Sequence, residues 1–212
     1  MNQFCSSRAA PWVLVPAKKP ELSKTRLAPL LPPGTRAALA RRLLARLLHL
    51  LGAARARGLV AEIVVVSPDP GLLALAATRG AYPLVEMVHT LNGALDEAQR
   101  AAVARGAAAT LVLPTDLPSL CLADIARLVE RGRRAPSVVL APSRRDGGTN
   151  ALLQRPAGLI PFAFGPDSAQ WHAGFTRKRG VPLAILRTPG LAFDLDLPED
   201  WCALERAGAT GR

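Results

Sequence analysis

The chain has 212 residues, of which half are hydrophobic, and it carries a formal net charge of +11. This length suits one domain with a sizeable core, and the hydrophobic share excludes an intrinsically disordered chain. The positive charge favours anionic ligands such as nucleotides and phosphorylated acids. Most of it comes from arginines, which compositional bias would also explain. The lysines are harder to explain in this way, because Lys18, Lys19 and Lys24 share one short segment.

The cysteines bear on the cellular compartment. Cys5, Cys121 and Cys202 are odd in number, lie far apart and form no Cys-x-x-Cys motif, which predicts a reducing compartment and no zinc site. The first ten residues contain no apolar core of signal-peptide length, and no apolar run is long enough to cross a bilayer. We therefore expect a cytoplasmic protein that does not bind a membrane.

Short apolar runs alternate with longer helical patterns along the chain. Strands are predicted over residues 12–15, 63–67, 83–85, 110–113 and 138–141, and helices over residues 34–57, 72–78, 95–104 and 122–131. The later residues are less regular, with extended pieces at 151–153, 160–164 and 183–186, a helix over 167–179 and a last helix from 199. The alternation predicts a three-layer α/β fold with a mostly parallel sheet, as one domain over residues 1–212 with its core at about 12–204.

Carboxylates follow two of the apolar runs. Asp116 comes just after the strand at 110–113, and Asp194 and Asp196 lie two residues apart before Pro198. Residues two apart in an extended segment point to the same side, and ligands of α/β sheets bind beyond the carboxyl ends of the strands. Because Mg²⁺ prefers carboxylate and phosphate oxygens, the pattern predicts a metal–phosphate site. The alternative is that each aspartate caps a helix or starts a turn.

A basic loop, residues 16–27, follows the first predicted strand and contains Lys18, Lys19, Lys24 and Arg26. Cations in that place can bind a triphosphate. The loop lacks the Gly-x-x-x-x-Gly-Lys pattern of a P-loop, and a solvated surface loop is the alternative interpretation.

A glycine loop, residues 143–150, is a second candidate for anion binding. Its two glycines let backbone N–H groups turn toward an anion, and Thr149 and Asn150 add side-chain donors. Asp-Gly is also typical of a hairpin turn, and both interpretations can hold together.

The turn at residues 164–168 leads into a helix whose N-terminus would attract phosphate or carboxylate, unless Asp167 or Ser168 simply caps that helix. His172, four residues after Ser168, could approach the same site, although a structural role is favoured for it. No Ser/His/Asp or Cys/His arrangement indicates a covalent nucleophile.

These segments, in this order, resemble the CofC/FbiD guanylyltransferases, which are related to MobA-like nucleotidyltransferases. The resemblance covers residues 12 to 204, and Gly-Gly-Thr-Asn followed by the later Asp-x-Asp is its more specific part. It implies a Rossmann-like nucleotidyltransferase fold. It also implies transfer of GMP from GTP to 2-phospho-L-lactate, phosphoenolpyruvate or 3-phosphoglycerate, in biosynthesis of the deazaflavin coenzyme F-420.

The resemblance also implies roles for individual residues. Asp116, Asp194 and Asp196 would hold Mg²⁺. The phosphorylated acid would contact Thr149, Gly165 and Ser168. The nucleotide would contact Lys18, Lys24, Arg26 and Asn92, and Lys24 and Asp116 would act in catalysis. The glycine-rich first loop of the wider superfamily is replaced here by Pro-Ala-Lys-Lys-Pro.

Two other functions are weighed against this one. A metal-dependent sugar-nucleotide glycosyltransferase could use Asp-x-Asp on a similar fold, but those enzymes usually carry the motif mid-chain, whereas Asp194 lies near the end. A basic nucleic-acid-binding module would need aromatic platforms or a recognition motif, and neither is found, so no nucleic-acid partner is expected. The choice of acid stays open, as does a homodimer.

Overall fold

The computed structural model describes residues 9–210, which fold around one seven-stranded sheet with strand order β3-β2-β1-β4-β6-β5-β7. The strands are β1 (Trp12–Pro16), β2 (Ile63–Ser67), β3 (Tyr82–Val85), β4 (Thr110–Val112), β5 (Ser137–Pro142), β6 (Thr149–Arg155) and β7 (Leu183–Ile185). Neighbouring strands are parallel except at β6, which pairs antiparallel with β4 and β5. The mostly parallel sheet predicted from the sequence is confirmed.

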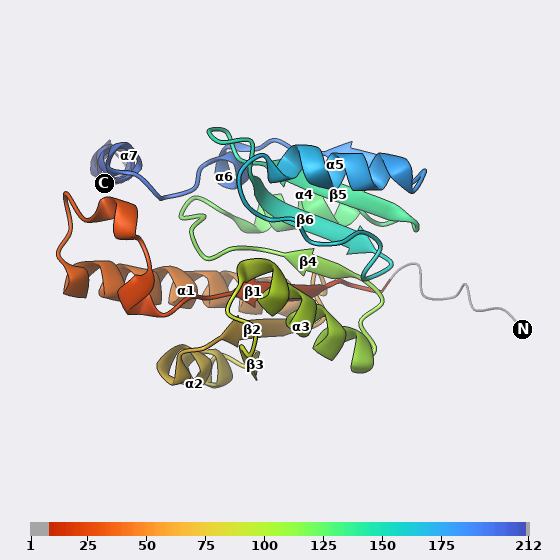
Figure 1. Ribbon diagram of the computed structural model, residues 1–212, viewed down its shortest axis with the longest axis horizontal. Helices are drawn as coiled ribbons and strands as arrows, with labels where there is room; N and C mark the ends of the chain where they lie inside the picture. The colour runs from red at the N-terminus through yellow and green to blue at the C-terminus, as the bar shows by residue number, and fades with distance from the viewer. Residues whose placement is uncertain (1–8, 211–212) are drawn as a thin grey trace, which may run out of the picture.

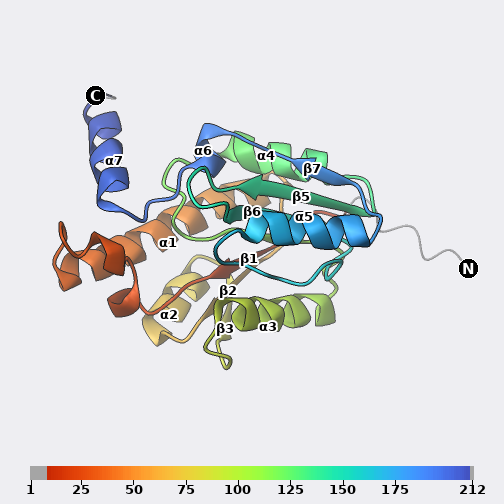
Figure 2. The ribbon, with the colours of Figure 1, turned by 45° about the horizontal axis from the view of Figure 1, so that its top comes forward.

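Helices cover both faces of this sheet and complete three layers (Figures 1 and 2). The helices are α1 (Pro33–Ala56), α2 (Pro70–Thr78), α3 (Leu91–Ala104), α4 (Leu122–Arg131), α5 (Ser168–Lys178), α6 (Pro189–Ala192) and α7 (Pro198–Thr210), with 3-10 turns η1 (Pro20–Leu22) and η2 (Thr25–Leu27). Helices α1, α2 and α4 pack on one face, and α3 and α5 pack on the other.

Each face of the sheet has its own apolar core, because successive side chains of a strand point to opposite faces. Val13 and Val15 of β1 join the core under α1, together with Leu48. Leu14, between them, joins the core under α3, together with Leu95. These leucines are at most 1 % exposed, and burial of each stabilises the fold by about 1.5–3 kcal/mol.

Three segments differ from the sequence prediction. Helix α3 begins at Leu91, earlier than expected, because Thr90 Oγ1 accepts a hydrogen bond from Gly93 N (3.2 Å) and caps the helix. Residues 160–164, expected to be extended, join no strand of the sheet and instead pack on the α3–α5 core through Phe162. Helix α6 was not expected, since one turn is too short to show a helical period.

The glycine loop connects β5 to β6 as a hairpin, with Ser143 N donating to Gly148 O (2.8 Å). A connection this short can join only antiparallel strands, which explains why β6 runs against its neighbours. The hairpin interpretation of Asp-Gly is therefore confirmed. It also places the loop at the edge of the sheet where β1, β4 and β5 end, which is the edge expected to bind ligands.

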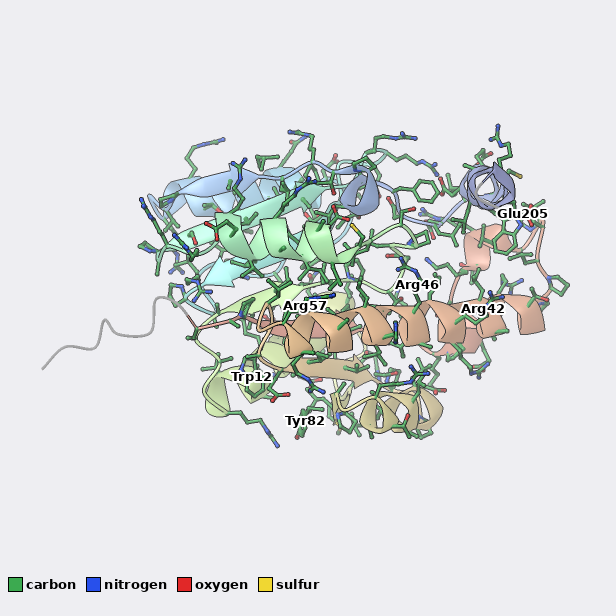
Figure 3. All side chains as sticks on the ribbon, turned by 180° about the vertical axis from the view of Figure 1, so that it is seen from behind. Trp12, Arg42, Arg46, Arg57, Tyr82 and Glu205 are labelled. Atoms are coloured by element: carbon green, nitrogen blue, oxygen red, sulfur yellow. The ribbon has the colours of Figure 1, made fainter. Side chains whose placement is uncertain are left out.

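Much of the positive charge lies on helix surfaces. Figure 3 shows Arg42 and Arg46 on α1 and Arg57 just after its end, and all three are exposed. Cys121 and Cys202 are free cysteines, whereas Cys5 lies outside the described residues. Over residues 9–210, no helix combines the length and apolar character needed to span a bilayer.

Candidate active site

A cavity of about 540 Å³ lies at the edge of the sheet where β1 and β4 end. It is lined by the basic loop, the loop after β4, the glycine loop, the turn at 164–168 and the acidic segment, which we define as residues 193–197. The structure therefore brings together segments that are widely separated in sequence. The predicted site residues that line it are Lys18, Lys24, Arg26, Asp116, Thr149, Gly165, Ser168, Asp194 and Asp196.

Lys24 is the most enclosed cation of the basic loop, with a side chain only 8 % exposed. Its Nζ donates hydrogen bonds to Asp116 Oδ2 (3.0 Å) and to Leu195 O (2.7 Å). Its backbone has φ of 55°, a left-handed conformation that costs a non-glycine residue about 1–3 kcal/mol and is enriched at functional sites. Lys24 thus joins the basic loop to both acid-bearing segments.

Asp116 and Asp194 are held next to each other by contacts between their segments. Leu195 N donates to Asp116 O (2.9 Å), while Asp194 Oδ1 accepts from Ser143 Oγ (3.1 Å) and Asn150 Nδ2 (3.4 Å). Burial raises the pKa of Asp194 above its usual value, and the charge of Asp116 adds to this effect, although the hydrogen bonds oppose it. Two repelling carboxylates beside a cavity would be stabilised by a shared cation.

The acidic segment itself is irregular chain between α6 and α7, so the extended segment expected to carry Asp194 and Asp196 does not belong to any strand of the sheet. The reason is Asp200, which accepts from Asp196 N (3.1 Å) and Leu197 N (2.8 Å) at the start of α7. Burial alone would raise the pKa of Asp200, but these amides and the Arg145 guanidinium hold it below its usual value. Asp196 Oδ2 accepts from Arg26 Nη1 (2.8 Å) instead of joining the other two carboxylates.

The geometry bears on the predicted metal site. Among residues 9–210, no three His, Cys, Asp or Glu side chains are grouped closely enough to enclose a metal ion. Asp116, Asp194 and Asp196 therefore do not form such a group in the described residues, and their role as Mg²⁺ ligands stays a prediction. Asp116 and Asp194 nevertheless fit Mg²⁺, which commonly binds through one or two carboxylates and completes its shell with substrate phosphates and water.

Hydroxyl groups line another part of the cavity. Ser168 Oγ donates to Thr149 Oγ1 (3.0 Å), and His172 Nδ1 lies 2.9 Å from the same oxygen. The nearby Gly165 has φ of 142°, a conformation that favours glycine. The first amides of α5 are already bonded, Ser168 N to Gly165 O and Ala169 N to Gly147 O. This helix end therefore contributes its dipole to the site, and the hydroxyls are the side-chain donors beside it.

Asn92 is the predicted nucleotide contact that does not line this cavity. Its Oδ1 accepts from Phe164 N (2.7 Å) and its Nδ2 donates to Phe164 O (3.1 Å). Both ends of the amide are thus used to hold the backbone of the turn at 164–168. The structure gives Asn92 a supporting contact that the sequence pattern did not reveal.

A second cavity of about 380 Å³ shares Pro16, Lys18, Leu22 and Leu91 with the first. Glu86 lines it, and burial raises the pKa of this carboxyl, while His89 and Lys18 oppose the shift. Sequence reasoning missed Glu86 because it follows β3 without any motif. The stretch Glu86-Met87-Val88-His89 gives no signal that could have found it.

Known proteins are similar to this chain over most of its length. Over residues 12–209 the chain matches the family described as "Guanylyl transferase CofC like". It is 42 % identical over 197 residues to a phosphoenolpyruvate guanylyltransferase of Rubrobacter xylanophilus, covering 93 % of this chain and 94 % of that protein. A 3-phospho-D-glycerate guanylyltransferase of Colwellia psychrerythraea is 34 % identical over 188 residues, covering 89 % and 88 %.

A solved Methanothermobacter nucleotidyl transferase has a TM-score of 0.64 at 17 % identity, covering 96 % of this chain and 99 % of that one, and shows the same fold. The family match spans residues 12–209, a range that includes every segment that lines the cavity. By its match to the family over residues 12–209 and its identity to curated relatives, the chain belongs to the CofC-like guanylyl transferase family.

Proposed function

We propose that this protein transfers GMP from GTP to a phosphorylated three-carbon acid and releases pyrophosphate, in biosynthesis of the deazaflavin coenzyme F-420. The observation that carries the proposal is one cavity that combines the cations of the basic loop with two carboxylates, Asp116 and Asp194, and two hydroxyls, Thr149 and Ser168. The names of relatives that act on phosphoenolpyruvate and 3-phospho-D-glycerate support an acid of this size.

In the proposed reaction, a phosphate oxygen of the acid attacks the α-phosphorus of GTP. The bond between the α-phosphorus and the bridging oxygen breaks, and pyrophosphate leaves with the electron pair. Repulsion between the two anions is the main obstacle, and Lys24 and Arg26 would offset it by neutralising phosphate charge. Mg²⁺, held by Asp116 and Asp194, would add further charge neutralisation. Thr149 and Ser168 would hold the acid in line, and Asp196 could become a further ligand if Arg26 moves to phosphate.

The function is tested by incubating the protein with Mg²⁺, GTP and, separately, phosphoenolpyruvate, 2-phospho-L-lactate or 3-phosphoglycerate. Pyrophosphate release together with a product mass of acid plus GMP is the expected result for at least one acid. Release of a nucleoside diphosphate from a sugar nucleotide would favour the glycosyltransferase alternative. Salt-sensitive binding to random duplex DNA, without pyrophosphate release, would favour the nucleic-acid alternative.

Substitution of the hydroxyls should affect the acid rather than GTP. We expect Thr149→Val and Ser168→Ala to raise the KM for the acid about ten- to a hundredfold, since a lost hydrogen bond to a charged group costs roughly 1.5–3 kcal/mol. Thr110→Val is a matched control, because Thr110 is also buried in a strand but does not line the cavity. If the KM for GTP rises instead, these hydroxyls belong to the nucleotide subsite.

We further propose that the second cavity receives the guanine base and that Glu86 recognises it. Guanine carries an N1–H and an exocyclic amine side by side, and one carboxylate can accept from both, whereas adenine offers no such pair. Glu86→Gln should therefore raise the KM for GTP roughly tenfold or more, leave the KM for the acid unchanged, and reduce the preference for GTP over ITP.

Asp96→Asn serves as the control for Glu86→Gln, because this acid of α3 is exposed and lines neither cavity. Steady-state kinetics with GTP and ITP on both variants give the answer. An unchanged preference for GTP over ITP in Glu86→Gln would place base recognition elsewhere.

A further inference from the structure

His172 is a buried histidine in contact with the hydroxyl pair. It lies on α5, is 0 % exposed and does not itself line the cavity. Ala163 N donates to its Nε2 (3.0 Å), and its Nδ1 lies 2.9 Å from Thr149 Oγ1. The ring of Phe164 packs against it edge-on, with ring centroids 5.0 Å apart. Both ring nitrogens therefore have a partner within the protein.

The amide of Ala163 determines which ring nitrogen carries the proton. A backbone N–H can only donate, so Nε2 must accept and must be unprotonated. Burial lowers the pKa of His172 to about 4, so the ring is neutral at pH 7 and its single proton lies on Nδ1. Nδ1–H accordingly donates to Thr149 Oγ1.

This tautomer changes what the hydroxyl pair can do. Thr149 and Ser168 have two hydroxyl protons between them, and one is used in the bond that joins their oxygens. The proton used in that bond belongs to Ser168, which donates to Thr149. Because Nδ1–H of His172 also donates to Thr149, the hydroxyl proton of Thr149 is not needed for either bond. Thr149 lines the cavity, so its hydroxyl can donate to an anion there. In the opposite tautomer, Nδ1 would accept that proton and no hydroxyl donor would remain for an anion.

We propose that His172 is a positioning residue. Ala163 holds it in the Nδ1–H form, and in this form His172 leaves the Thr149–Ser168 pair with a hydroxyl proton to donate to the anionic acid. The identity of the anion rests on the proposed function, whereas the tautomer does not. A histidine that merely fills space beside Phe164 would require neither ring nitrogen in a particular state. The two roles therefore differ in a measurable property.

Two substitutions separate the functions of the two nitrogens. The amide of asparagine can occupy the Nδ1 position and donate to Thr149, whereas the amide of glutamine reaches the Nε2 position and accepts from Ala163. We expect His172→Gln to raise the KM for the acid about tenfold, with the KM for GTP unchanged, and His172→Asn to retain most of the affinity that His172→Gln loses. Thr176→Ala is the control, because it removes the hydrogen bond from Thr176 Oγ1 to the backbone oxygen of His172 (2.7 Å) and leaves the contacts of both ring nitrogens in place.

A double-mutant cycle tests whether His172 acts through Thr149. In a Thr149→Val background, His172→Gln should cause no further rise in the KM for the acid. Independent, additive effects would overturn the inference. The same holds for equal effects of His172→Gln and His172→Asn, or for a parallel rise in the KM for GTP.

The tautomer can also be read without any activity, which keeps the inference testable if a variant fails to fold. The chain has three histidines, and the exposed His49 and His89 can be replaced by glutamine one at a time, so the imidazole ¹⁵N signals that neither substitution removes belong to His172. At pH 7 we expect Nδ1 to be protonated and Nε2 to be unprotonated; a proton on Nε2 would overturn the inference. Absence of GMP transfer to every acid would refute the proposed function instead, while the ¹⁵N spectrum of the same sample would still decide the tautomer.

Discussion

Replacing Asp116 or Asp194 by asparagine is expected to lower turnover about a thousandfold, since a lost ligand to the catalytic metal removes several kcal/mol of transition-state stabilisation. Both carboxylates line the cavity, and the backbones of their segments are joined by the bond from Leu195 N to Asp116 O (2.9 Å). Pyrophosphate release measured against Mg²⁺ concentration gives the result. Near-normal Mg²⁺-dependent turnover in either folded variant would contradict the assignment of these residues.

The stability of the Asp194→Asn variant separates loss of catalysis from loss of fold. Because the pKa of Asp194 is raised in the folded protein, its ionised form is disfavoured there, and at neutral pH the charge destabilises the fold relative to the unfolded chain. Asparagine removes that charge and retains an oxygen that can accept from Ser143. We therefore expect the Tm to be unchanged or higher while activity is lost. A clearly lower Tm would mean that the variant is inactive because it unfolds.

Lys24→Ala is expected to lower kcat about a hundred- to a thousandfold, the range seen when a preorganised donor to developing charge is removed. The side chain of Lys24 is 8 % exposed and lines the cavity, so its ammonium can meet the leaving pyrophosphate with little solvent screening. The loss should appear in kcat beyond any change in the affinity for GTP, because the charge it neutralises grows in the transition state.

Lys19→Ala is the matched control for kcat, since Lys19 lies in the same loop and carries the same charge but is exposed and lines only the second cavity, not the first. We expect only a mild effect from it, smaller still at physiological salt. Steady-state kinetics on both variants decide between the two interpretations of the basic loop. Equal and mild effects would mean that the loop is a solvated basic surface and that another element binds the phosphates.

The layered fold could be predicted because its elements depend on local patterns. The β-branched run Ile63–Ser67 and the apolar period of residues 122–131 each need burial on a sheet, and alternation of such segments leaves a covered parallel sheet as the solution. The predicted ends were less accurate where a cap determines them. Helix α3 starts at Leu91 because the side chain of Thr90 caps it, and the Asn-Gly pair that follows Leu91 shows no helical period in the sequence.

The sequence by itself determined the layers of the sheet and the edge where the cavity lies, because the loops that follow β1, β4 and β5 meet at one edge of a mostly parallel sheet. The tertiary structure decided which side chains pair there. Lys24 donates to Asp116, which is 92 residues away in the sequence. Arg26 donates to Asp196, which is 170 residues away, and this bond keeps Asp196 apart from the other two carboxylates. The protonation of His172 likewise depends on the amide of Ala163, a contact made by folding rather than by any local pattern. Charges and hydrogen bonds act over a few ångströms of space, and such distances are set only once the chain has packed.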